Sequence, residues 1–134
     1  SMLNNPIIVL DSNELILSLK GSNPYSKSLI DNLSTLNEIY DFRINDGIFQ
    51  EVIRNIPHYT KEKFGKLLNI GAIKKQDFSI DKNLISKYKN LGLKKGDIVI
   101  AAYAELCKAN FIISENRHFL QELKTRKFKI VNTN

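Results

Sequence analysis

The sequence has 134 residues, a mass of 15.4 kDa and 43% hydrophobic residues, which suits one folded domain and leaves little room for a second. Twenty Lys plus Arg against fourteen Asp plus Glu give a net charge of +6, which favours an anionic partner such as nucleic acid. The single cysteine, Cys107, excludes a disulfide within the chain. It lies in an apolar stretch, where we expect it to pack as a small hydrophobic residue.

The sequence also favours a cytoplasmic protein. No apolar run approaches the roughly 18 residues that a membrane-spanning helix needs, and the start lacks the pattern of a signal peptide. Ser1 before Met2 is typical of the remnant of an expression tag, so the predicted domain covers residues 2–134. We therefore expect no membrane partner.

The first third of the chain predicts a buried strand and an amphipathic helix. Residues 6–10 are apolar and rich in β-branched side chains, as in a central strand covered on both faces, and Asp11 follows at its carboxyl end. After Gly21 and Pro24, apolar residues recur at helical spacing and predict about four turns of helix. The recurring positions are Leu29, Leu33, Leu36 and Tyr40. This stripe can belong to the core or to an interface.

A short strand flanked by Phe42 and Ile44 and then a pair of helices are expected next. The first of these helices carries Glu51 in its second turn. The second has an apolar face built from residues 64–68. The expected capping and terminating residues are, in chain order, Asn45 or Asp46, Pro57, Thr60 and Gly71.

The remainder alternates strands with helices. We expect a strand around residues 70–73, a helix capped by Asp81 that stops near Gly92, and a helix from Ile98 to about Lys108 opened by Gly96-Asp97. The β-branched start of the last helix could form a strand instead, but the alanines that follow favour helix. Residues 111–114, 115–124 and 128–131 are then predicted as strand, helix and strand. This alternation predicts a three-layer α/β/α fold with a mainly parallel central sheet.

Acidic and amide side chains occur where such a fold could bring them together. Asp11 and Asn116 directly follow predicted strands, Asp97 begins a helix, and Glu51 lies on a helix that could cross the same sheet edge. Ligands bind beyond the carboxyl ends of parallel strands, and converging carboxylates suit Mg²⁺ or Mn²⁺. Taken singly, each residue has a simpler explanation, because Asp11, Asp97 and Asn116 are natural caps and a helical Glu is usually exposed.

Four segments, in this order, resemble the motifs of the PIN-domain nucleases. They are Asp11-Ser12-Asn13 after the first strand, Glu51 within residues 49–53, Asp97 at the start of residues 97–102, and residues 113–119. The resemblance runs from about Ile7 to the end of the chain. The departure is Asn116, where many members carry Asp, and the neighbouring Glu115 is a candidate substitute.

The resemblance implies a PIN-like fold and metal-dependent endonucleolytic cleavage of RNA. It assigns Asp11, Glu51, Asp97 and Asn116 to the catalytic set, with Mg²⁺ or Mn²⁺ held by Asp11, Asp97 and Glu51. Ser12 and Ser114 would support these carboxylates through hydroxyl hydrogen bonds. Hydroxide attack on the phosphate would leave a 5′-phosphate and a 3′-hydroxyl.

Lysine and arginine residues flank the proposed site. Lys94, Lys95 and Arg117 are close in sequence to Asp97 and Asn116, so we expect them to contact the RNA backbone. Small stand-alone members of the family are commonly toxins of toxin-antitoxin pairs, which implies an antitoxin partner and a homodimer. The alternative is a catalytically silent PIN-like module that binds RNA or protein, since Asn116 replaces an acid.

Overall fold

The computed structural model describes residues 5–115 and 128–133, which form a five-stranded sheet in the order β3-β2-β1-β4-β5. Every pair of neighbouring strands is parallel. The strands are β1 (Ile7–Leu10), β2 (Asp41–Ile44), β3 (Lys74–Lys75), β4 (Phe111–Ile113) and β5 (Lys129–Val131). The helices of the described residues are α1 (Ser12–Lys20), α2 (Pro24–Leu36), α3 (Asp46–Asn55), α4 (His58–Asn69), α5 (Lys82–Asn90) and α6 (Lys95–Leu106).

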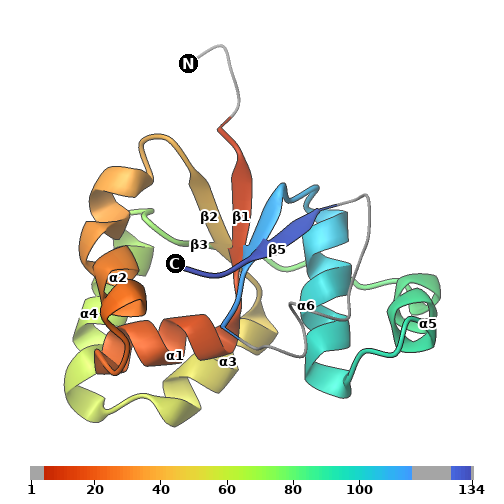
Figure 1. The fold of residues 1–134 in the computed structure, drawn as a ribbon, viewed down its shortest axis with the longest axis horizontal. Coiled ribbons are helices and arrows are strands. Elements are labelled where there is room, and N and C mark those ends of the chain that lie inside the picture. The colour runs from red at the N-terminus through yellow and green to blue at the C-terminus, as the bar shows by residue number, and fades with distance from the viewer. Residues whose placement is uncertain (1–4, 116–127, 134) are drawn as a thin grey trace.

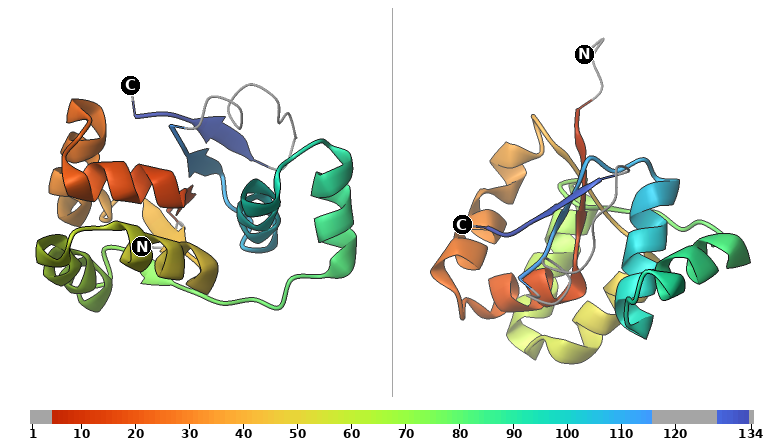
Figure 2. Two further views of the ribbon diagram at one scale, coloured as in Figure 1. Left: turned by 90° about the horizontal axis from the view of Figure 1, so that it is seen from below. Right: turned by 45° about the vertical axis from the view of Figure 1, so that its right-hand side comes forward.

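The elements are arranged in three layers. Helices α1 to α4 lie on one side of the sheet, and α6 lies on the other with α5 outside it (Figures 1 and 2). The side chains of β1 are buried from Ile8 to Leu10, as expected for a central strand covered on both faces. The predicted α/β/α architecture with a parallel sheet is therefore confirmed.

Helix α3 is fixed at its start by a buried side chain. The side-chain oxygen of Asn45 accepts a hydrogen bond from the Ile48 amide at 2.8 Å, and Asn45 is only 6% exposed. Ile48 and Val52 bury one face of the helix, which leaves Glu51 partly exposed on another. The cap and the apolar face together set the position from which Glu51 projects.

Several predicted elements appear where the sequence placed them. The strands β1, β2, β4 and β5 and the helices α2, α3 and α5 all match predicted segments within a few residues. Asp81 caps α5 by accepting a hydrogen bond from the Asn83 amide at 2.8 Å. Residues 98–106 are helical rather than extended, and Cys107 is buried, both as expected.

Four local expectations need correction. Residues 12–20, for which no element was predicted, form α1, a helix that starts one residue after β1 and buries Leu15 and Leu19. Thr60 does not cap α4, because the helix begins at His58 and the Thr60 hydroxyl bonds back to the Pro57 carbonyl at 2.7 Å.

The third strand and the start of α6 also differ from expectation. The strand is Lys74–Lys75 rather than residues 70–73, since Ala72 and Ile73 are still bonded to the end of α4 through the Leu67 carbonyl. Helix α6 begins at Lys95, so Asp97 lies in its first turn and Lys94 is the cap position. The helix expected at residues 115–124 lies almost wholly outside the described residues.

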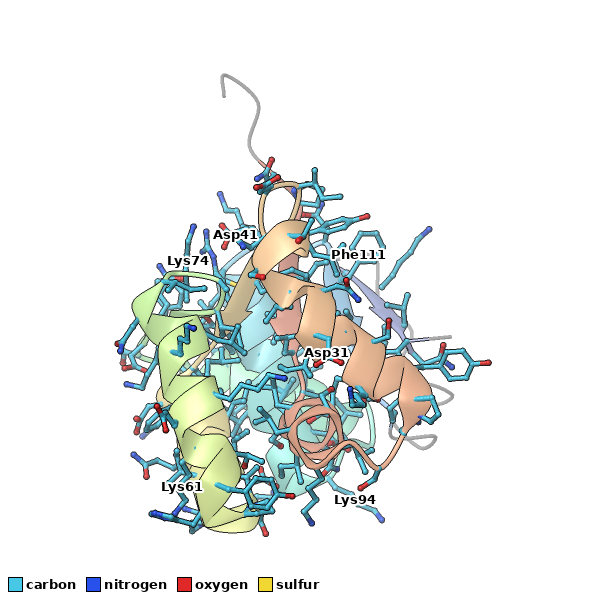
Figure 3. The ribbon with its side chains drawn as sticks, turned by 90° about the vertical axis from the view of Figure 1, so that its left-hand side faces the viewer. Asp31, Asp41, Lys61, Lys74, Lys94 and Phe111 are labelled. Carbon is cyan, nitrogen blue, oxygen red and sulfur yellow. The ribbon has the colours of Figure 1, made fainter. Side chains whose placement is uncertain are left out.

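The apolar stripe of α2 is divided between the core and a cavity. Leu33 is fully buried, whereas Leu29 and Leu36 line an apolar cavity of about 250 Å³ together with Phe111 of β4. Figure 3 shows Phe111 beside α2. Helix α2 is also tied to α4 by an ion pair of 2.9 Å between Asp31 and Lys63. Within the described ranges, no helix is both long and apolar enough to cross a membrane.

We predict that Asn45→Ala lowers the free energy of unfolding by about 1 kcal/mol, because it removes the buried cap of α3. Urea unfolding followed by circular dichroism measures this change. Asn69→Ala, at an exposed position of α4, is the control and should change stability by less than about 0.5 kcal/mol. Equal effects of the two substitutions would contradict the assigned role of the cap.

Candidate functional site

The site is built around Asp11, which follows the central strand and is 2% exposed. Its backbone amide continues the pairing of β1 with β4 by donating to the Ile113 carbonyl at 3.1 Å. Its own carbonyl accepts a hydrogen bond from the Leu15 amide at 3.2 Å and so starts α1, while its carboxylate forms no capping hydrogen bond. The strand ladder and the helix therefore fix the backbone and leave the carboxylate for other partners.

Two serine hydroxyls connect this carboxylate to its surroundings. Ser114, at the end of β4, donates from Oγ to Asp11 Oδ2 at 2.6 Å. The Ser12 hydroxyl lies 2.9 Å from Glu51 Oε2 and 3.4 Å from Asp11 Oδ1. Ser12 thus stands between the carboxylates of Asp11 and Glu51, although they are far apart in sequence.

The three predicted acids lie within electrostatic reach of one another. Burial raises the pKa of Asp11, the hydrogen bond from Ser114 lowers it, and the negative charges of Asp97 and Glu51 raise it further. Asp97 and Glu51 are both partly exposed, so the cluster is buried at Asp11 and opens toward solvent at the other two acids. We call Asp11, Glu51 and Asp97 the acidic cluster.

The chemistry of the acidic cluster fits a hard divalent cation. Its donors are carboxylate oxygens, and a bound cation would offset the mutual repulsion that raises the pKa of Asp11. In the described part of the chain, no three His, Cys, Asp or Glu side chains form a ready-made metal site. The Ser12 hydroxyl instead links two of the three carboxylates, those of Asp11 and Glu51.

The other predicted site residues are only partly placed. Lys94 and Lys95 are exposed at the start of α6, the helix that carries Asp97. Asn116 and Arg117 lie outside the described residues, so their predicted roles stay predictions. Glu115 is described, and its Oε1 accepts hydrogen bonds from the amide and hydroxyl of Thr133 at 3.0 and 2.5 Å.

Glu14 is a buried acid that the sequence analysis missed. It lies on α1 and is 0% exposed. Burial raises its pKa to about 7, Ser26 opposes this shift, and Glu115 adds to it. The sequence offered only an indirect signal: the apolar residues Leu15, Ile16 and Leu19 suit a helix that is buried on several sides, and Glu14 lies within it.

Comparison with known proteins supports the fold. No family model matches the chain, and no curated protein matches it. Among solved structures, it is similar to a chain of the crystal structure of VapBC2 from Rickettsia felis bound to a DNA fragment from their promoter. That match has a TM-score of 0.66 and 18% identity, and covers 94% of this chain and 98% of the other. The chain thus has a PIN-like three-layer α/β/α fold.

We predict that Ser114→Ala raises the pKa of Asp11 above its wild-type value, because the hydrogen bond that favours the ionised carboxylate is lost. Carbon-13 NMR titration of the Asp11 carboxyl measures the change. Ser34→Ala, on the exposed side of α2, is the matched control. An unchanged titration of Asp11 in the Ser114 variant would show that this hydrogen bond does not stabilise the charge.

We further predict that Glu14→Gln flattens the pH dependence of stability. The folded-state pKa is raised, so the wild type loses stability as pH rises from about 4.5 to about 7, and the loss is complete above that range. By linkage the loss amounts to at most about 3 kcal/mol. Urea unfolding in EDTA at pH 5 and pH 8 measures it; an equal pH dependence in wild type and variant would contradict the raised pKa.

Proposed function

We propose that this protein is a Mg²⁺- or Mn²⁺-dependent endoribonuclease of the PIN type. The observation that supports this most lies at the carboxyl end of β1, where the Ser12 hydroxyl stands between the carboxylates of Asp11 and Glu51 and the charge of Asp97 raises the pKa of Asp11. Burying Asp11 beside two other acids lowers the stability of the fold in the absence of a cation. Such an arrangement is typical of a functional site. The PIN-like fold and the order of the motifs are consistent with the same activity.

The roles of the residues follow from their positions. Asp11 and Asp97 would hold the cation directly, Glu51 directly or through water, and Asn116 would complete the set. When bound, the cation would lower the pKa of the water molecule that it coordinates and would neutralise charge on the phosphate. Ser114 and Ser12 keep the carboxylates of Asp11 and Glu51 oriented through their hydrogen bonds.

The charge around the site suits an RNA substrate. Lys94 and Lys95 are exposed at the start of the helix that bears Asp97, so they would attract phosphates toward the acidic cluster. Arg117 is proposed to extend this contact. The basic groups therefore compensate for the negative charge that would otherwise repel a nucleic acid.

The proposal extends to partners and location. Because the similar structure is a VapBC2 assembly, we propose that this chain is the toxin of a toxin-antitoxin pair and is held inactive by an antitoxin. A homodimer and a cytoplasmic location belong to the same proposal. These parts rest on the fold likeness and the sequence resemblance rather than on the acidic cluster.

We predict that the wild type cleaves single-stranded RNA with Mn²⁺, leaving 5′-phosphate ends, and that Asp11→Asn and Asp97→Asn each lower the rate by at least about 100-fold. Loss of even an outer partner of a metal site costs about 10- to 100-fold, so loss of a ligand should cost as much or more. Both variants should fold, and Asp11→Asn should be slightly more stable, because a buried charge is removed. Gel analysis of end-labelled RNA and thermal unfolding measure these effects.

The control for this assay is Glu62→Gln, which removes an exposed acid from α4 and should cleave at the wild-type rate. Equal cleavage by wild type and Asp11→Asn would mean that the acidic cluster does not catalyse the reaction. Absence of cleavage in every protein would favour the silent PIN-like binding module.

A further inference from the structure

Two acids of the described residues are buried, Asp11 and Glu14, and burial is the main cause that raises the pKa of each. The charges of Asp97 and Glu51 add to the rise at Asp11, whereas at Glu14 the charge of the partly exposed Glu115 and a side-chain hydrogen bond with it add to the rise. Glu14 and Glu115 come from α1 and from the segment after β4, so the fold rather than the local sequence brings them together. This second pair of acids lies beside the acidic cluster but shares no carboxylate with it.

Two buried oxygens at this pair have no hydrogen-bond partner. Glu14 and Ser26 are both 0% exposed. Glu14 Oε1 accepts a hydrogen bond from the Ser18 hydroxyl at 3.2 Å, but its Oε2 and the hydroxyl oxygen of Ser26 accept or donate none. The Ser26 hydroxyl is nevertheless close enough to the Glu14 carboxyl to favour its charged form. Buried oxygens left in this way are unusual and indicate a missing partner.

Glu115 is held in place beside these oxygens. Its Oε1 accepts both hydrogen bonds from Thr133, at 3.0 Å from the amide and 2.5 Å from the hydroxyl. Glu115 also borders a cavity of about 400 Å³ that is lined by Asn13, Ile16 and Leu17. A hydrated ion could therefore reach Glu115 from this cavity, whereas Glu14 is 0% exposed and does not line it.

We propose that Glu14, Glu115 and Ser26 form a second binding site for a hard divalent cation such as Mn²⁺ or Mg²⁺. The donors are two carboxylates and a hydroxyl, all oxygens, and water from the adjoining cavity completes the coordination shell. The charge of the ion balances that of the two carboxylates. Bound there, the ion links α1, the start of α2 and the segment after β4, and so braces the backbone next to Asp11.

The test is calorimetric titration of Mn²⁺ into the full chain carrying Asp11→Asn, which weakens the acidic cluster and leaves the second site intact. We expect this protein to bind Mn²⁺. Adding Glu14→Gln or Glu115→Gln should lower the affinity by at least about tenfold, as loss of a ligand should. Adding Glu62→Gln, at an exposed position of α4, should leave the affinity unchanged.

Thermal unfolding supplies a second readout. Mn²⁺ should raise the Tm of the Asp11→Asn protein, and Glu14→Gln should abolish this rise while the protein still unfolds cooperatively in EDTA. The inference is wrong if the Asp11→Asn protein binds no Mn²⁺. It is also wrong if the Glu14 and Glu115 variants bind Mn²⁺ as tightly as the Glu62 variant. In either case Glu14 and Glu115 hold a proton rather than a metal ion. Neither result bears on RNA cleavage by the wild type, so the proposed nuclease function is tested separately.

Discussion

The candidate site depends on the position of one buried carboxylate, that of Asp11. Two hydrogen bonds fix Asp11 against β4: its amide extends the pairing of β1 with β4, and its side chain accepts a hydrogen bond from Ser114, directly after β4. Its carbonyl begins α1, so strand, site and helix meet at a single residue. A charge placed there is expensive to bury, and the surrounding hydroxyls offset only part of that cost.

The buried acids Asp11 and Glu14 lower the stability of the fold when they are charged. The raised pKa values of Asp11 and Glu14 mean that burial disfavours the charged form of each group, and neighbouring acids increase the effect. Apolar residues at these positions would avoid this cost of burying a charge. A ligand that binds only the folded state, as we propose for a divalent cation, would recover this loss.

The main features of the fold could be predicted because they depend on local patterns. The apolar run at residues 6–10 and the periodicity of α2 and α3 are set by burial, and Asn45 and Asp81 are ordinary helix caps. Helix α1 was missed because it follows β1 without a turn, which leaves no loop signal in the sequence. The third strand was misplaced since pairing with β2, a contact distant in sequence, decides where it lies.

The site could be predicted only in part. The spacing of Asp11, Glu51 and Asp97 suggested their convergence, but the bridging position of the Ser12 hydroxyl and the burial of Glu14 depend on tertiary packing. The most direct measurement is a crystal structure grown with Mn²⁺ and analysed by anomalous scattering. The proposed nuclease requires an anomalous peak contacted by the Asp11 and Asp97 carboxylates, whereas Mn²⁺-saturated crystals without a peak at those residues would contradict it.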